Sequence, residues 1–267
     1  MTDRLTDEAV TFIRENQRQP FFLYFSHYAV HTPLQAKKAM IEKYKSVPKG
    51  KRQGNPVYAA MVESVDQSVG RVMEELRALK LHEETLVIFT SDNGGFAGAT
   101  DHAPLRGNKG SYYEGGIRVP LIMRWPGVAK SGRVNNTPVI SMDLYPTCLT
   151  AAGLPMHRAQ HRDGIDLRPL LKGEKHLSRK ALHWHYPHYN SHPSAAPSSV
   201  LRKGNWKLIE AFDPQSIELY NLEKDLSETK NLADVEPEKL AELQKELSDW
   251  RESVGAEKME SNPDYQN

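Results

Sequence analysis

Two short apolar runs separated by a long amphipathic stretch dominate the first hundred residues of the chain. Phe21 to Ser26 and Thr85 to Thr90 have the length and apolar character of buried strands. Between them, apolar residues recur at three- and four-residue steps from Pro56 to Leu81, which predicts a long helix covering one side of a sheet. The order of strand, helix and strand is typical of an α/β fold with parallel strands.

Further elements are predicted on either side of this unit. Spaced apolar residues before Pro20 predict an amphipathic helix at the N-terminus, and Val119 to Trp125 predicts a third strand. We therefore expect a mixed, largely parallel sheet flanked by helices. In such sheets, ligands collect beyond the carboxyl ends of the strands.

The pattern changes near residue 175, where we expect a domain boundary between residues 1–175 and a small α+β subdomain at 176–267. His183 to Pro197, rich in His, Pro, Ser and Ala, is predicted to be an extended loop. Short strands at Ser199 to Ile209, divided by a turn at Lys203-Gly204-Asn205, and at Glu218 to Tyr220 predict a small antiparallel sheet, and a helix that begins near Pro237 is expected to pack on it. The apolar stripe of this helix comprises Leu240, Leu243, Leu247, Trp250 and Val254.

Composition excludes several classes of partner. The 35 basic and 34 acidic residues nearly cancel, and the chain has no long run of like charge, so nucleic acid is not an expected partner. No apolar stretch reaches about 20 residues and no signal peptide is recognisable, so we expect a soluble chain without membrane contact and leave its location open. The single cysteine, Cys148, cannot form an intramolecular disulfide and is assigned to packing.

Polar residues follow the predicted strands where a site would form. Asp92 and Asn93 offer a carboxylate and an amide oxygen to one point, as Ca²⁺ or Mg²⁺ prefers, although an Asp-Asn-Gly turn with self-satisfied side chains is an alternative. Lys109 lies between glycines and could bind an anionic oxygen or be a solvated surface lysine. Arg118 is expected to fix its loop through a carboxylate.

Two histidines follow the first predicted strand. His31 lies in the loop beyond it and could donate a proton to a leaving oxygen. His27 is nearer the strand and is equally well interpreted as a hydrogen-bonded wall residue. Taken singly, neither histidine identifies a reaction.

The order of the motifs is more informative than any one of them. Ser-His…His-Thr-Pro at residues 26–33, Thr-Ser-Asp-Asn-Gly-Gly at 90–95 and the glycine-rich stretch at 105–120 occur in this order. Together they resemble the type I sulfatases, formylglycine-dependent hydrolases of the alkaline phosphatase superfamily. Later stretches extend the resemblance over nearly the whole chain: residues 141–147, 163–167, 202–208 and 218–222. It implies hydrolysis of sulfate esters, of sulfated carbohydrates or aryl sulfates.

The resemblance also implies roles for individual residues. Asp92 and Asn93 would be two ligands of a divalent cation, usually calcium with Mg²⁺ as an alternative, and Lys109 would hold a sulfate oxygen. A metal and a cation on the oxygens, together with an acid on the leaving group, suit a dianion-like transition state. The histidines would act on the substrate side, with His31 protonating the leaving alcohol and with His27 and His102 contacting the sulfated small molecule or glycan. Three others could border the same cleft: His183, His185 and His188.

One expected part of such an enzyme is not in these residues. The family's formylglycine, made from Cys or Ser in Cys/Ser-X-Pro-X-Arg, and the early Asp-Asp pair that completes the metal site have no counterpart in the 267 residues. We therefore expect the C-terminal part of a sulfatase, with little activity alone, exposed apolar sheet edge and association with a missing N-terminal half. Two alternatives stay open: a phosphodiester or phosphonate hydrolase of the same superfamily, and a non-catalytic remnant that binds sulfated glycans.

Overall fold

The computed structural model describes residues 1–48, 54–190, 192 and 196–260, which form two compact units. The first unit comprises residues 1–90, 98–101 and 120–177, and the second comprises residues 91–97, 102–119 and 178–267. Within the described residues, no helix has both the length and the apolar character needed to cross a membrane.

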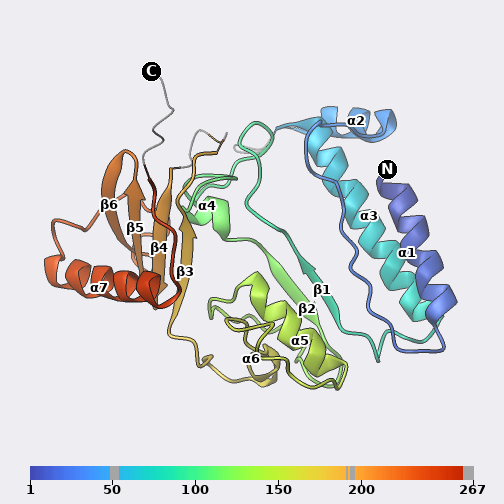
Figure 1. Ribbon diagram of the computed structural model, residues 1–267. Helices are drawn as coiled ribbons and strands as arrows, with labels where there is room; N and C mark the ends of the chain where they lie inside the picture. The colour runs from blue at the N-terminus through green and yellow to red at the C-terminus, as the bar shows by residue number, and fades with distance from the viewer. Residues whose placement is uncertain (49–53, 191, 193–195, 261–267) are drawn as a thin grey trace. The chain divides into compact units, whose positions relative to one another are not determined.

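Helices pack side by side in the first unit. The predicted N-terminal and long helices are confirmed as α1 (Thr2–Asn16) and α3 (Pro56–Ala78), with α2 (Lys38–Lys45) packed against α3 (Figure 1). The start of α3 is fixed by Pro56 in its first turn and by Asn55, whose Oδ1 accepts hydrogen bonds from two backbone amides at 3.0 Å. The buried apolar face of α1 consists of Ala9, Val10 and Ile13.

The strands of the first unit differ in part from expectation. β1 (Val87–Thr90) and β2 (Leu121–Arg124) confirm two predicted strands, but they pair antiparallel, with Ile88 opposite Met123. The strand expected at residues 21–26 is wrong, because this stretch is extended but makes no ladder with another described segment. Its side chains alternate between half-buried and exposed, and Phe22 and Tyr24 are 71% and 81% exposed. An apolar run alone could not reveal that the ladder partner is absent.

In the first unit, the buried carboxylate of Asp143 connects two stretches of the chain that are separated in sequence. Asp143 ends a short 3₁₀ turn, η1 (Ser141–Asp143), that leads into α5 (Leu144–Ala151), and α6 (Arg168–Lys172) follows. The Asp143 carboxylate accepts from the Ile140 and Ile165 backbone amides, each at 2.9 Å. These hydrogen bonds hold the backbone at Ile140 and the backbone at Ile165 together and so stabilise the fold. Cys148 lies half-buried in α5, where burial raises the pKa of its thiol.

The second unit contains a four-stranded antiparallel sheet, as predicted, with one more strand than expected. Its order is β3 (Ala181–Tyr186), β4 (Ser198–Lys203), β5 (Trp206–Phe212) and β6 (Gln215–Asn221). The extended loop predicted for residues 183–197 is therefore wrong at its start, since β3 pairs with β4 along its whole length. Residues 191 and 193–195 of that prediction lie outside the described residues.

The two faces of this sheet bury different partners. One face packs against α7 (Pro237–Ser253), the predicted last helix, and forms a leucine core of Leu201, Leu208, Leu219, Leu243 and Leu247 (Figure 1). On the other face Val200, Ile209 and Tyr220 pack with Tyr112 and Tyr113, which come just before the short helix α4 (Glu114–Ile117). Strand alternation explains the division, because neighbouring residues point to opposite faces.

Candidate active site

The residues predicted to bind a cation, Asp92 and Asn93, and the residue predicted to bind an anion, Lys109, lie in the second unit. Their backbone segments are joined by hydrogen bonds. Lys109 N donates to Gly95 O at 3.0 Å, and Gly94 N donates to Gly116 O at 2.8 Å. The structure therefore brings the Asp-Asn-Gly-Gly turn at residues 92–95 against both the Lys109 segment and α4. The resemblance implied that Asp92, Asn93 and Lys109 act on one site, and these hydrogen bonds bring their backbone segments together.

Close backbone approach explains the glycines in these motifs. A Cβ atom at Gly94 would lie 1.9 Å from Gly115 O, and one at Gly116 would lie 2.1 Å from Ser111 O. Both distances are far below van der Waals contact, and the atoms that would be met belong to the backbone, which cannot rotate away. The segments can therefore pack at this distance only if these positions carry no side chain.

The side chains of Asp92 and Asn93 suit a hard cation but do not complete a site. Asp92 is exposed, and Asn93 is half-buried with its Nδ2 donating to Gly94 O at 2.8 Å, which leaves Oδ1 as an acceptor. One carboxylate and one amide oxygen fit Ca²⁺ or Mg²⁺ in type, whereas Ca²⁺ takes about six to eight oxygen ligands. Among residues 1–48, 54–190, 192 and 196–260, no cluster of three or more His, Cys, Asp or Glu side chains could hold a metal.

Lys109 lies in the middle of a loop, here called the Lys109 loop, that runs from Arg106 to Tyr113. Gly107 and Gly110 on either side of it have φ angles of 76° and 93°, in the left-handed region that glycine tolerates. The base of the loop is closed by Gly115 N, which donates to Arg106 O at 2.7 Å. The half-buried Lys109 is thus carried by a closed, hydrogen-bonded loop.

Aromatic and acidic side chains of the sheet hold the ends of the Lys109 loop. The Arg106 guanidinium stacks 3.8 Å from the centre of the Tyr113 ring and donates to Tyr220 Oη at 2.8 Å. Tyr113 Oη donates to Glu218 at 2.8 Å, and burial together with this carboxylate raises the pKa of Tyr113 to about 12. Tyr113 therefore stays protonated at neutral pH and serves as a donor.

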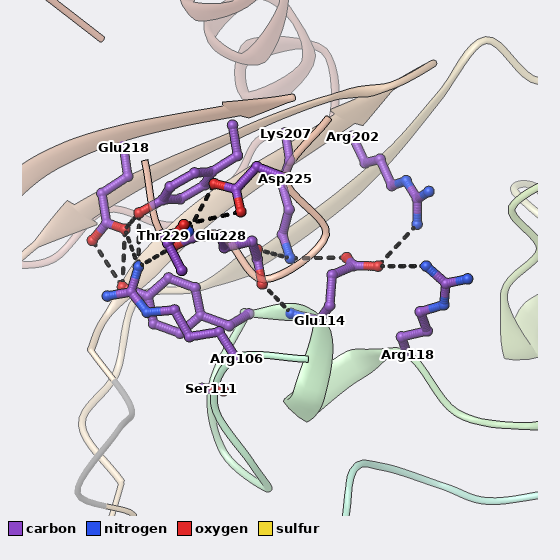
Figure 2. A network of polar contacts seen from close by, with 12 residues as sticks. Arg106, Ser111, Glu114, Arg118, Arg202, Lys207, Glu218, Asp225, Glu228 and Thr229 are labelled. Atoms are coloured by element: carbon purple, nitrogen blue, oxygen red, sulfur yellow. Dashed lines mark hydrogen bonds and ion pairs between the residues drawn. The ribbon is translucent and has the colours of Figure 1, made fainter. Parts of the chain in front are cut away.

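A fully buried ion cluster lies beneath the Lys109 loop, and sequence reasoning did not find it (Figure 2). Lys207 Nζ lies 3.0 Å from Glu114 Oε1 and 2.8 Å from Glu228 Oε1, and all three side chains are 0% exposed. Arg118 and Arg202 each approach the other oxygen of Glu114 at 3.5 Å. A lysine among the apolar residues at the start of β5 was the one available signal, because buried lysines require ionic partners.

Arg118 and His102, both in the second unit, were also singled out from the sequence. The contact between Arg118 and Glu114 confirms that Arg118 fixes its loop through a carboxylate. His102 is half-buried, and its carbonyl oxygen accepts from Leu105 N at 2.9 Å. Its contact with a substrate stays a prediction.

Three histidines in β3 and just after it, His183, His185 and His188, make contacts within the sheet and with the chain around it. The His183 ring stacks on Trp250 with centres 4.5 Å apart, and His188 makes an edge contact with Tyr186. His185 is hydrogen-bonded at 2.7 Å to Ser199 Oγ and, through its other ring nitrogen, to Glu257 O. These contacts orient all three rings, and a role in bordering a cleft stays a prediction.

His27 and His31 belong to the first unit. His27 is half-buried, with its ring 4.2 Å from that of Phe25 and its Nε2 3.4 Å from Ser68 Oγ, which also accepts from Thr6 Oγ1 at 2.6 Å. His31 is exposed, and its Nδ1 lies 2.9 Å from Thr32 O. His27 has the environment of a wall residue and His31 that of an accessible one, while their roles toward a substrate stay predictions.

Burial lowers the pKa of His27 from its ordinary value of 6.5, which makes the first unit sensitive to acid. The unfolded chain binds a proton at this position more readily than the folded chain, so the free energy of unfolding falls as the pH drops below 6.5. We expect His27→Phe to be less acid-sensitive than the wild type when urea unfolding is compared at about pH 7.5 and about pH 5.5. Equal loss of stability in both proteins would contradict this assignment. The control is His176→Phe, at an exposed histidine of the same unit, which should lose stability in acid as the wild type does.

Comparison with known proteins identifies the family to which these features belong. Residues 1–154 match the sulfatase family, and residues 108–254 match the family described as N-sulphoglucosamine sulphohydrolase, C-terminal. The chain is 39% identical over 253 residues to a sulfatase of Formosa agariphila, covering 87% of this chain and 46% of that protein. It is 38% identical over 195 residues to human steryl-sulfatase, covering 70% of this chain and 32% of that protein.

Solved structures show the same fold. The crystal structure of Ps i-CgsB in complex with k-i-k-neocarrahexaose superposes with a TM-score of 0.81 at 32% identity, over 93% of this chain and 54% of that one. A phosphonate monoester hydrolase of Agrobacterium radiobacter superposes with a TM-score of 0.59 at 26% identity, over 74% of this chain and 41% of that one. The chain thus spans about half the length of these proteins or less. From the two family matches, the sequence identities and the shared fold, this chain belongs to the sulfatase family, within the alkaline phosphatase superfamily.

Proposed function

We propose that this chain contributes one side of the active site of a sulfate-ester hydrolase. Asp92 and Asn93 supply two oxygen ligands to a divalent cation, Ca²⁺ or Mg²⁺, and Lys109 binds a sulfate oxygen. The observation that supports this best is the direct backbone pairing of the Lys109 segment with the Asp-Asn-Gly-Gly turn. A cation and an ammonium held by one rigid framework can stabilise the oxygens of a tetrahedral anion.

The resemblance to the sulfatases supports roles for three histidines as well. His31 protonates the leaving alcohol, and His27 and His102 contact the substrate. A bound cation would draw charge from the sulfate oxygens and so ease cleavage of the S–O bond. A sulfated carbohydrate or aryl sulfate is the proposed substrate class, and the neocarrahexaose named with Ps i-CgsB supports the carbohydrate.

The proposed site needs residues that these 267 do not contain. They include no Cys/Ser-X-Pro-X-Arg motif, and Asp92 and Asn93 cannot saturate a cation. We propose that the chain works together with an N-terminal half that supplies the formylglycine and the other metal ligands. The 267 residues alone should hydrolyse an aryl sulfate no faster than background.

The test joins residues 1–267 to the N-terminal remainder of the Formosa agariphila sulfatase, matured with formylglycine. We expect calcium-dependent hydrolysis of p-nitrophenyl sulfate, and a fall in kcat/KM of about 100-fold or more in Lys109→Ala and Asp92→Ala. Lys130→Ala, at an exposed lysine, is the control and should retain full activity. A folded, formylglycine-bearing protein without activity, or with activity indifferent to Lys109→Ala, would refute the proposal.

A second function is favoured by the structural similarity to the phosphonate monoester hydrolase. Phosphate diesters and phosphonates present the same tetrahedral oxygens to a cation and a lysine, so these residue types alone do not exclude them. The same joined protein distinguishes the two by its rates on matched sulfate, phosphate and phosphonate esters. Binding of a sulfated glycan by the 267 residues that survives both Asp92→Ala and Lys109→Ala would instead indicate a non-catalytic role.

A further inference from the structure

The position of Lys109 depends on what holds the two ends of its loop. Lys109 lies midway between Arg106 and Tyr113, and the loop is closed at its base by the hydrogen bond between Gly115 N and Arg106 O. Movement at either end would therefore move the lysine. The groups that anchor these ends decide where the ammonium is presented.

Glu228 contacts both sides of the loop base. Its backbone carbonyl oxygen accepts from Arg106 Nη1 at 2.7 Å, at the beginning of the loop. Its carboxylate oxygen Oε2 accepts from Glu114 N at 2.6 Å, directly after the end of the loop. Its second oxygen, Oε1, lies 2.8 Å from Lys207 Nζ, which in turn lies 3.0 Å from Glu114 Oε1 (Figure 2). Glu228 thus binds the beginning of the loop through its main chain and the residue after the end of the loop through its side chain.

The turn that carries Glu228 is itself firmly held. Glu228 has a φ of 51°, which is uncommon for a residue with a side chain. The turn is fixed by the Asp225 carboxylate, which accepts from the Thr229 and Lys230 amides, each at 2.8 Å. Burial raises the pKa of Glu228, and the nearby Lys207 ammonium opposes that shift. An unusual backbone conformation and a buried carboxylate are maintained here by several contacts at once.

We propose that Glu228, in the connection between β6 and α7, is a positioning residue. It fixes the position of Lys109 by binding both ends of the Lys109 loop. Its side chain acts through Glu114 and Lys207, and its main chain acts through Arg106. The role of Lys109 in binding an anion rests on the proposed function, whereas the hold of Glu228 on the loop is a property of the fold. The sequence gap of more than 100 residues between the two hides this relationship in the primary structure.

Amide hydrogen exchange of the purified 267-residue chain tests the hold on the loop directly. In Glu228→Ala, exchange of residues 106–117 should accelerate by about tenfold or more, because Glu114 N loses its acceptor and Lys207 loses one of its two carboxylates. In Glu228→Gln the effect should be smaller, since the amide oxygen can still accept from Glu114 N. Residues 237–253 in α7 should exchange as in the wild type, because the leucine core lies on the other face of the sheet.

Controls and kinetics separate positioning from general stability. Glu223→Ala removes an exposed glutamate from the same connection, one that pairs with Asn205, and should leave residues 106–117 unchanged. In the joined sulfatase, kcat/KM for p-nitrophenyl sulfate should fall by about tenfold or more in Glu228→Ala and less in Glu228→Gln. Faster exchange spread equally over α7 and the sheet, or unchanged exchange at residues 106–117, would overturn the inference. An inactive joined wild type would refute the proposed function while leaving the exchange result to decide this one.

Discussion

Gly94→Ala is expected to separate the Asp-Asn-Gly-Gly turn from α4 and so to dismantle the proposed cation site. The added Cβ would lie 1.9 Å from Gly115 O and 2.9 Å from Gly116 Cα, both of which are backbone atoms. Relief requires one segment to move, which breaks the hydrogen bond from Gly94 N to Gly116 O. Overpacking of this kind lowers the free energy of unfolding by about 1–3 kcal/mol or more.

Two measurements check this expectation. Urea unfolding reports the loss of stability, and in the joined sulfatase kcat/KM should fall by about 100-fold, because Asp92 and Asn93 would no longer be held in place. The control is Gly70→Ala in the exposed interior of α3, where an added Cβ meets nothing within 4 Å. That change should stabilise the chain by about 0.5–1 kcal/mol. A Gly94→Ala protein with wild-type stability and activity would show that the close packing described above is wrong.

Leu247→Ala is expected to be among the most damaging single truncations in the second unit. Leu247 is 0% exposed and packs in the leucine core between α7 and the sheet. Truncating a fully buried leucine removes apolar contacts and leaves a cavity, which together lower the free energy of unfolding by about 2–5 kcal/mol. Unfolding followed through Trp206 and Trp250, which pack against this core, should show a shifted transition.

Matched variants define what this result means. Leu247→Met keeps most of the volume and should lower stability by less than about 1.5 kcal/mol. The prediction that Val254 belongs to the apolar stripe of this helix is wrong, because Val254 lies just beyond the end of α7 and is 54% exposed. Val254→Ala should therefore change stability by no more than about 0.5 kcal/mol. If Leu247→Ala and Val254→Ala unfolded alike, α7 would not be anchored by this stripe.

The elements that sequence predicted well are those whose pattern is complete in itself. α1, α3 and α7 each show a helical apolar stripe, and α3 and α7 carry proline in the first turn, so their existence follows from local residues. β5 and β6 alternate in period two and were found for the same reason. In these segments, local preference and tertiary packing agree.

Errors arose where structure depends on a distant partner. Residues 21–26 have the composition of a strand, but pairing decides whether a ladder forms, and the described chain offers them no partner. β3 was missed for the opposite reason, because its histidines suggested a loop while pairing with β4 makes it an edge strand. Long-range pairing of this kind is not encoded in any short window of sequence.

The candidate site divides in the same way. Asp92, Asn93 and Lys109 could be nominated because their motifs are short and contiguous, and their roles stay predictions, whereas the assignment of Arg118 to a carboxylate is confirmed. The ion cluster joins residues 114, 207 and 228, whose separation in sequence leaves only a strand lysine as a signal. Residues proposed to touch a ligand were therefore easier to nominate from sequence than the residues that hold their backbone segments in place.

Because the sheet of the second unit packs a different partner on each face, the residues that contact one partner can change without changing those that contact the other. Along β5, Leu208 faces α7, whereas Lys207 and Ile209 face the loop that carries the proposed anion-binding lysine. Changes in the packing of the C-terminal helix can be matched by changes at every second strand position without altering the residues in between. The outer helix can therefore be repacked by substitution while the residues that support the Lys109 loop stay unchanged.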